Sequence, residues 1–251
     1  MYKQTLHYMA KQNVKKTPPK GSIRFSISLS EEQKKAKTSI LKHPFNFIVD
    51  QACKMGAKLV YASSAAVYGN LNNKTFKIGS ENPDNPYAYS KYAMDCKTIS
   101  LIKSPKKYKI VGLRYFNVYG DGEEFKYKTA STILQFANQI LNGKNPKLFL
   151  GSDKIFRDFV YIDDVIQATV NAGILENSGV YNVGTGTARS FFDVVKIVKE
   201  NLGSDLKIDY IKNPYEKGYQ YFTQADIRKT KEDLNYFPKY NLEKGIKDYM
   251  L

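Results

Sequence analysis

The sequence contains few of the side chains that form metal sites, disulfides and imidazole-based catalytic sites. It has no tryptophan, two cysteines and two histidines among 251 residues. Both histidines, His7 and His43, lie in the first 43 residues, so the rest of the chain has no imidazole for acid–base chemistry or zinc binding. No metal site is predicted, and proton transfer has to come from Tyr, Lys, Asp or Glu. Cys53 and Cys96 fall in helical patterns, and we expect free, buried thiols of a reducing compartment.

Long hydrophobic runs are also missing. No apolar segment approaches the roughly 18 residues of a membrane span, and the polar, basic start lacks the apolar core of a signal peptide. We therefore expect no membrane partner and a cytoplasmic location. The hydrophobic fraction of 42% and the aromatic fraction of 14% are typical of a globular protein.

Positive charge is unevenly distributed along the chain, whose formal net charge is +15. Residues 1–43 hold ten Lys and Arg against Glu31 and Glu32, while residues 44–251 hold 29 basic and 22 acidic residues. The second segment shows no basic stripe with interleaved aromatic side chains, which argues against a nucleic-acid partner. A moderately basic globular part favours a substrate that carries phosphate groups.

From Phe45 onward, apolar periodicity predicts alternating helices and strands. The expected helices are 45–57, 87–102, 129–143, 163–175 and 190–203, with at least one more in the tail. The expected strands are 58–63, 108–116, 147–151, 157–162, 179–183 and 207–211. Because strands that alternate with helices form a parallel, doubly wound sheet, the predicted fold class is α/β.

The segment YAYSK indicates a site for proton transfer. Tyr87 and Lys91 are four residues apart on one predicted helix, so they lie on the same face, one turn apart. The ammonium can stabilise the phenolate and lower the pKa of the Tyr87 hydroxyl from its usual value of about 10. Ser64, at the end of the strand in YASSAAVYG, can hydrogen-bond the same substrate oxygen. Together, these three side chains can move a proton on or off a sugar hydroxyl while a hydride leaves the carbon that carries it.

Further motifs follow in order: KIVGLRYFNVYG (109–120), KLFLGSDKIFRDFVYIDDV (147–165), GVYNVGTG (179–186) and YQYFTQAD (219–226). Together they resemble the extended short-chain dehydrogenase/reductase family, and within it the NAD-dependent epimerases and dehydratases, from about Phe45 to the C-terminus. The resemblance implies a partial Rossmann-like sheet with a smaller C-terminal substrate domain.

The same resemblance divides the chain into three parts. Residues 1–43 lie outside the family and are expected to be poorly ordered. Residues 44–120 would be the remaining part of the dinucleotide-binding domain. Residues 121–251 would be mainly the substrate-binding domain, with 159–190 returning to the Rossmann-like sheet.

The pairing of KLFLGSDKIFRDFVY with YQYFTQAD resembles the epimerases that act on ADP-heptose. It implies interconversion of ADP-D-glycero- and ADP-L-glycero-D-manno-heptose at C6 by oxidation and reduction with NADP, or with NAD. It also implies a role in lipopolysaccharide core biosynthesis, a Gram-negative cytoplasm and a homo-oligomer. Two alternatives stay open: another nucleotide-sugar epimerase or dehydratase, and a non-catalytic remnant that at most binds the ADP-sugar or an intact homologue.

Catalytic roles follow from the resemblance. Tyr87 would be the acid/base at the C6 oxygen, Lys91 would also bind the nicotinamide ribose, and Ser64 would hydrogen-bond the reacting oxygen. Lys126 matches a second acid/base position that also faces the cofactor, and one base for each face suits a ketone that is reprotonated from opposite sides. Val118 would lie at the boundary between cofactor and sugar.

Substrate contacts are expected at Asn117, Lys128, Gln135, Phe149, Leu150, Gly151, Ser152, Arg157 and Tyr219. Arg157 suits a diphosphate because a guanidinium can engage two phosphate oxygens at once. Its alternative is a surface ion pair with Asp158 or Asp163. The alternative for Tyr219 is a place in the hydrophobic core.

A Gly-rich phosphate loop is not found before the first predicted strand. Members of the family hold the dinucleotide pyrophosphate on such a loop at a helix N-terminus, whereas the first glycines here are Gly21 and Gly56. We read GTGTARS (184–190) as a turn and not as a displaced phosphate loop. We therefore expect weakened cofactor binding, an exposed edge on the 58–63 strand, and a start that is misassigned, frameshifted or degraded.

Overall fold

The computed structural model describes residues 44–71, 75–106, 108–214 and 219–250. The expectations for residues 1–43, including both histidines, lie outside these ranges. The described residues fall into two units that divide after Ala57.

In the first unit, helix α3 (Pro44–Lys54) is described. The chain leaves it through Gly56, whose φ of 65° suits glycine, and the Ala57 amide donates to the Ala52 carbonyl at 2.9 Å. The predicted helix is therefore confirmed, and Gly56 closes it.

The second unit is built on a parallel three-stranded sheet. Its strands are β1 (Leu59–Ser64), β2 (Ile110–Tyr115) and β6 (Gly179–Val183), in the order β1-β2-β6. Ser64 is in register with Tyr115, and Tyr115 with Val183. The carboxyl ends of all three strands therefore lie at one edge of the sheet, where open α/β sheets bind ligands.

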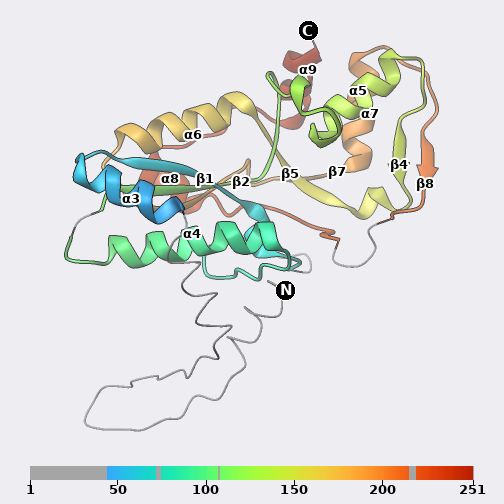
Figure 1. The fold of residues 1–251 in the computed structure, drawn as a ribbon. Coiled ribbons are helices and arrows are strands. Elements are labelled where there is room, and N and C mark those ends of the chain that lie inside the picture. The colour runs from blue at the N-terminus through green and yellow to red at the C-terminus, as the bar shows by residue number, and fades with distance from the viewer. Residues whose placement is uncertain (1–43, 72–74, 107, 215–218, 251) are drawn as a thin grey trace, which may run out of the picture. The chain divides into compact units, whose positions relative to one another are not determined.

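Helices cover both faces of this sheet (Figure 1). Helix α4 (Pro86–Ile102) lies against one face and α6 (Ile162–Ile174) against the other. Helix α4 begins as its sequence dictates, because the Asn85 side chain accepts from the Ala88 amide at 2.9 Å and Pro86 occupies the first position. Helix α6 has no side-chain cap, but Asp163 and Asp164 complement its N-terminal dipole. The predicted doubly wound arrangement is confirmed.

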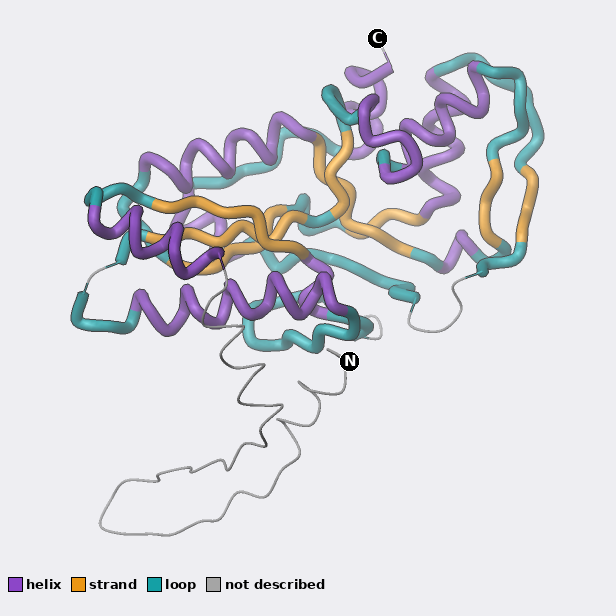
Figure 2. Tube along the Cα trace, viewed as in Figure 1, coloured by secondary structure: helices purple, strands orange, loops and turns teal. Residues whose placement is uncertain are grey.

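The remaining elements flank this layer (Figure 2). Strand β5 (Phe156–Tyr161) pairs in parallel with β3 (Asn117–Tyr119) and antiparallel with β7 (Ala188–Ser190). Strands β4 (Lys147–Phe149) and β8 (Asp209–Ile211) form a second pair. The other described helices are α5 (Thr132–Leu141), α7 (Phe191–Asn201), α8 (Arg228–Leu234), α9 (Leu242–Met250) and the short 3-10 helices η1 (Ala65–Tyr68), η2 (Glu124–Thr129) and η3 (Ser152–Lys154).

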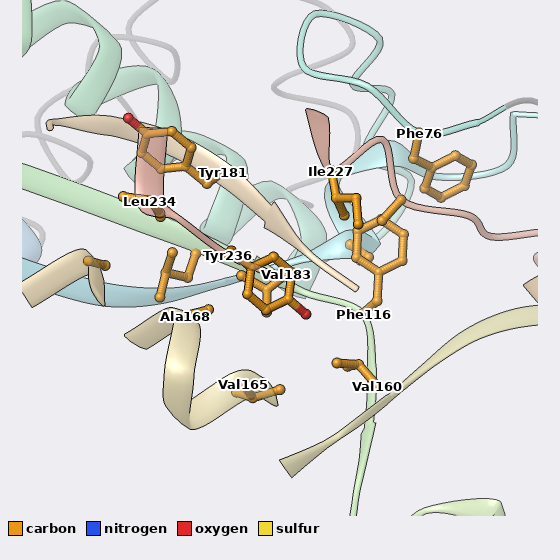
Figure 3. Packing of buried hydrophobic residues seen from close by; sticks show 14 of the residues in the cluster. Phe76, Phe116, Val160, Val165, Ala168, Tyr181, Val183, Ile227, Leu234 and Tyr236 are labelled. Carbon is orange, nitrogen blue, oxygen red and sulfur yellow. The ribbon is translucent and has the colours of Figure 1, made fainter. Parts of the chain in front are cut away.

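Two hydrophobic clusters hold these layers together. In the first, Val165 and Ala168 of α6 lie with Tyr236 around Val183 at the end of β6 (Figure 3). The second joins α5, α7 and α9, and includes Ile133, Val194, Val198 and Ile246. The first cluster supports the strand ends, so the edge that carries the candidate site stands on a packed core.

One expectation about the cysteines is wrong. Both thiols are free, as predicted, but Cys53 is half-buried and Cys96 is exposed. Cys96 lies off the face of α4 that carries the buried Asp95 and Thr98, because residues one position apart point in different directions around a helix. Across the described part of the chain, every helix is too short or too polar to span a membrane.

Candidate active site

Ser64 stands at the carboxyl edge of the central sheet. As the last residue of β1, it also caps η1, because its Oγ accepts from the Ala66 amide at 3.2 Å. The backbone donor uses an acceptor position of the hydroxyl, so the hydroxyl proton stays available for a ligand oxygen.

Tyr87 and Lys91 occupy the first turns of α4 beside this strand end. The Lys91 amine lies 5.9 Å from the centre of the Tyr87 ring. It also donates to the Ala62 carbonyl at 2.8 Å, two residues before Ser64. The Tyr87 side chain is 54% exposed, so its hydroxyl is open to a ligand. The structure therefore brings these two residues to the strand that ends in Ser64.

Asn117 and Val118 follow β2 at the same edge. Asn117 is exposed and Val118 is half-buried, and β3 pairs these residues with Phe159 and Val160 of β5. Since Ser64 is in register with Tyr115, Asn117 comes two residues beyond the position opposite Ser64. The amide side chain of Asn117 can thus reach a ligand at the strand ends.

Lys126 lies apart from these residues on η2. Its side chain is exposed, and no hydrogen bond or ring contact joins it to Tyr87, Lys91 or Ser64 in the part of the chain that the structure describes. The backbone turns sharply at Tyr127, whose φ of 47° and ψ of −115° are unusual for a residue with a side chain. The side chain of Lys128 is not among the parts of the chain that the structure describes. Gln135 of α5 donates to the Ala130 carbonyl at 2.8 Å and so braces the end of this segment.

Arg157 is buried and lies near two aromatic rings. Its guanidinium carbon lies 5.5 Å from the Phe191 ring centre and 5.3 Å from that of Tyr219. Its Nη1 donates to the Phe156 carbonyl at 2.8 Å, and burial lowers the pKa of the guanidinium. Among described residues it forms no ion pair, so the surface-pair alternative is wrong.

The side chain of Asp158, the next residue of β5, points to the opposite side of the strand from Arg157, because successive residues of a strand face opposite sides. Its carboxylate accepts from the amide and hydroxyl of Thr185, both at 2.7 Å, from the Gly186 amide at 2.9 Å and from the Ala225 amide at 3.0 Å. The amides of Thr185 and Gly186 are therefore engaged within the protein and are not free to bind a pyrophosphate. Residues 184–187 form a turn, whereas Ala188–Ser190, also read as part of the turn, form strand β7.

Phe149 and Tyr219 form an aromatic wall beside Arg157. The rings of Phe149 and Tyr219 lie 6.2 Å apart, edge to face. After β4, Leu150 is exposed and Gly151 has a φ of 77°, while Ser152, the first residue of η3, is buried. Tyr219 is half-buried and contacts Arg157, so its alternative of a core position is wrong.

Hydrogen bonds tie this wall to the strand-end site. The Asn70 side chain donates to the Tyr219 carbonyl at 3.3 Å, and the Gln220 side chain donates to the Gly69 carbonyl. Residues 69 and 70 directly follow η1, which Ser64 caps. The two groups of predicted residues therefore belong to one connected region.

The donors at the strand-end site suit the ribose end of a nicotinamide cofactor. An ammonium has three donors, and among the described residues the Lys91 amine spends one of them, on the Ala62 carbonyl. The remaining donors can bind ribose hydroxyls. In the same described ranges, no three His, Cys, Asp or Glu side chains gather where a metal ion could be held.

Comparison with known proteins places the chain in a family. The model of the NAD dependent epimerase/dehydratase family matches residues 45–184. The chain belongs to this family. Its Rossmann-like fold is that of solved family members, as the sequence predicted.

Among similar proteins, the ADP-L-glycero-D-manno-heptose-6-epimerase of Brachyspira hyodysenteriae is 43% identical over 200 residues, which are 76% of this chain and 62% of that protein. The crystal structure of the Helicobacter pylori enzyme of the same name has a TM-score of 0.74 at 48% identity, over 82% of this chain and 63% of that one. The UDP-glucose 4-epimerase of Thermotoga maritima, solved with UDP-glucose, has a TM-score of 0.73 at 27% identity, over 82% and 66%. The chain thus spans less than two thirds of the length of the two heptose epimerases.

Proposed function

We propose that this chain catalyses epimerisation at C6 of an ADP-glycero-manno-heptose. The observation that carries the proposal is the position of Tyr87 and Lys91 on α4 beside the strand that ends in Ser64. Identities of 43% and 48% to two heptose epimerases support the choice of sugar. We further propose the dinucleotide NADP and a role in supplying heptose for lipopolysaccharide core assembly.

A bound nicotinamide would supply the chemistry of accepting a hydride from C6 and returning it. Tyr87, as the phenolate, takes the proton from the C6 hydroxyl as the C6–H bond breaks and the ketone forms. The Lys91 ammonium stabilises the negative charge on the Tyr87 oxygen. Ser64 donates a hydrogen bond to the carbonyl oxygen.

Epimerisation requires that C6 regain its hydride on the opposite face, with a proton returned to the oxygen. We propose that Lys126 supplies this proton after the sugar turns over in the site. Lys126 is exposed on η2, a segment without a hydrogen bond to the strand-end residues within the described ranges.

The nucleotide diphosphate would bind at Arg157, whose flat guanidinium can engage two phosphate oxygens. Phe149 and Tyr219 extend the binding surface beside it. The remaining predicted contacts, which stay proposals, are Asn117, Lys128, Gln135, Leu150, Gly151 and Ser152. We also propose that Val118 and Lys126 contact the cofactor and that the chain divides into residues 44–120 and 121–251. A cytoplasmic location and a homo-oligomer are further proposals.

The test uses the full 251-residue chain with NADP and ADP-D-glycero-D-manno-heptose in deuterated water. Proton NMR should show the C6 epimer with protium retained at C6, because the hydride leaves and returns without exchange with solvent. Tyr87→Phe should abolish turnover. Absence of epimer with the unaltered chain, or turnover of a UDP-hexose in its place, would overturn the assignment.

A further inference from the structure

Asp95 lies on the same face of α4 as the proposed catalytic pair. It comes one turn after Lys91 and two turns after Tyr87, at spacings of four residues. Its side chain is fully buried, and it accepts from the Tyr61 hydroxyl at 2.8 Å and from the Ser63 hydroxyl at 2.9 Å. Both donors belong to β1, the strand that ends in Ser64.

Arg114 of β2 holds the other side of this carboxylate. Its Nε donates to Asp95 Oδ2 at 2.7 Å, and its Nη1 donates to Glu81 at 2.5 Å and to the Tyr68 hydroxyl at 2.9 Å. Arg114 is fully buried. Burial raises the pKa of Asp95, while the neighbouring guanidinium opposes that rise. A buried charge pair of this kind is well suited to fixing one arrangement of the elements that supply it.

Successive turns of α4 are thereby joined to β1. Thr98 donates to the Tyr61 hydroxyl at 3.0 Å, Asp95 binds Tyr61 and Ser63, and Lys91 donates to the Ala62 carbonyl at 2.8 Å. The next turn of the helix carries Tyr87. The next residue of the strand is Ser64.

Glycine at position 112 makes room for these contacts. A Cβ atom there would lie 2.4 Å from the Tyr61 hydroxyl oxygen, inside contact distance. Since Gly112 is the register partner of Tyr61 on β2, the two strands and the helix meet at this ring.

We propose that Asp95, held by Arg114, is a positioning residue that sets the register of α4 against β1 and so places Tyr87 opposite Ser64. This inference rests on the proposed function for its catalytic consequence. Asp95 touches no reacting group in this scheme. It acts mainly through the bonds of its carboxylate to Arg114 and Tyr61, which hold α4 beside β2 and beside the strand that ends in Ser64.

The kinetic test compares Asp95→Asn with a matched core variant, Val198→Ala, in the full chain. Val198 is fully buried in the second cluster, away from α4 and β1. We expect Asp95→Asn to lower kcat at least tenfold with KM within threefold, because the substrate contacts stay while the catalytic pair is displaced. Val198→Ala should lower the thermal unfolding midpoint but leave kcat unchanged. Wild-type kcat in Asp95→Asn, or an equal fall of kcat in both variants, would overturn the positioning role.

A second measurement does not depend on turnover. In a crystal structure of Asp95→Asn, the Lys91 amine should no longer reach the Ala62 carbonyl, while in Ser63→Ala, which keeps the Asp95–Arg114 pair, it should remain there. An unchanged Lys91–Ala62 hydrogen bond in Asp95→Asn contradicts the inference even if the chain does not turn over ADP-heptose. Absence of turnover in the unaltered chain would overturn the proposed function alone.

Discussion

The guanidinium of Arg157 lies with its carbon 5.3 Å from the centre of the Tyr219 ring. The same carbon lies 5.5 Å from the ring centre of Phe191. Cation–aromatic contacts of this kind hold a guanidinium in place without neutralising it. Within the described residues no carboxylate pairs with Arg157, so its charge is available to an anionic ligand.

Arg157→Lys should therefore weaken the binding of ADP about tenfold, or roughly 1.4 kcal/mol. A lysine keeps the charge but cannot stack a planar group on an aromatic ring or engage two phosphate oxygens at once. Isothermal titration calorimetry with ADP measures the change. The control is Arg189→Lys at the position paired with Arg157 on β7, where the side chain binds Glu243 and Asp193. Equal losses in both variants would contradict a diphosphate site at Arg157.

Asp158 gives the stability of the fold a specific pH dependence. Burial raises the pKa of Asp158 to about 6, although hydrogen bonds from neighbouring amides and a hydroxyl act in the opposite direction. An unfolded aspartate has a pKa of about 3.9. Between these values the folded state binds more protons than the unfolded state, so the contribution of Asp158 to stability increases as the pH falls.

Asp158→Asn should remove this contribution. The free energy of unfolding of the unaltered chain, relative to that of the variant, should grow by about 2 kcal/mol between about pH 7.5 and about pH 4.5. Urea titrations of both proteins at several pH values measure the difference, in which the effects of other carboxylates cancel. A difference that stays constant or shrinks towards low pH would show that burial does not raise the pKa of Asp158.

Tyr127 is expected to be a site where glycine stabilises the protein. Its φ of 47° and ψ of −115° match the first central residue of a type II′ turn, which glycine dominates. Its ring is 82% exposed, so little packing is lost on its removal. Tyr127→Gly should raise the free energy of unfolding by about 1 kcal/mol through relief of backbone strain. Phe125→Gly, at an equally exposed position of η2 with negative φ, should lower it by about 0.5 to 1 kcal/mol.

Glu123 fixes the end of the segment that carries Lys126. Its buried carboxylate accepts from the Ser131 amide at 2.5 Å and from the Ser131 hydroxyl at 2.6 Å, while Ser131 itself caps α5. Glu123→Gln turns an amide NH₂ towards one of these donors, and we expect a loss of about 1 to 3 kcal/mol in stability. Cleavage by trypsin at Lys126 should also become faster. Glu124→Gln, at the exposed neighbouring position, is the control and should change neither quantity.

Periodicity predicts most of the second unit because its main elements are long enough to show a pattern. Strands β1, β2 and β6 and helices α4 to α7 lie where apolar spacing indicated them. Strands β3 and β7 have three residues each and were not predicted. Strands β4 and β8 are equally short, but each lies in a longer segment whose pattern predicted a strand. Strands β3 and β7 lack such a pattern, and their pairing with β5 depends on contacts distant in sequence.

The candidate site likewise has residues that the sequence predicts and residues that only the structure brings together. Tyr87 and Lys91 were recognisable because helical spacing places them together locally. The Asp95–Arg114 pair was not, since 19 residues and a change of element separate its members. The alternative of an ion pair between Arg157 and Asp158 could have been excluded from the sequence, because neighbours on a strand point to opposite sides.

The contacts between α4 and β1 also determine where this protein is able to move. Sliding the helix by one turn, about 5.4 Å, would break the bonds of Thr98, Asp95 and Lys91 simultaneously. We therefore expect α4 and β1 to move together as one rigid unit. In the proposed epimerisation the sugar must present both faces of one carbon to this unit, so the sugar has to rotate while α4 and β1 stay in place.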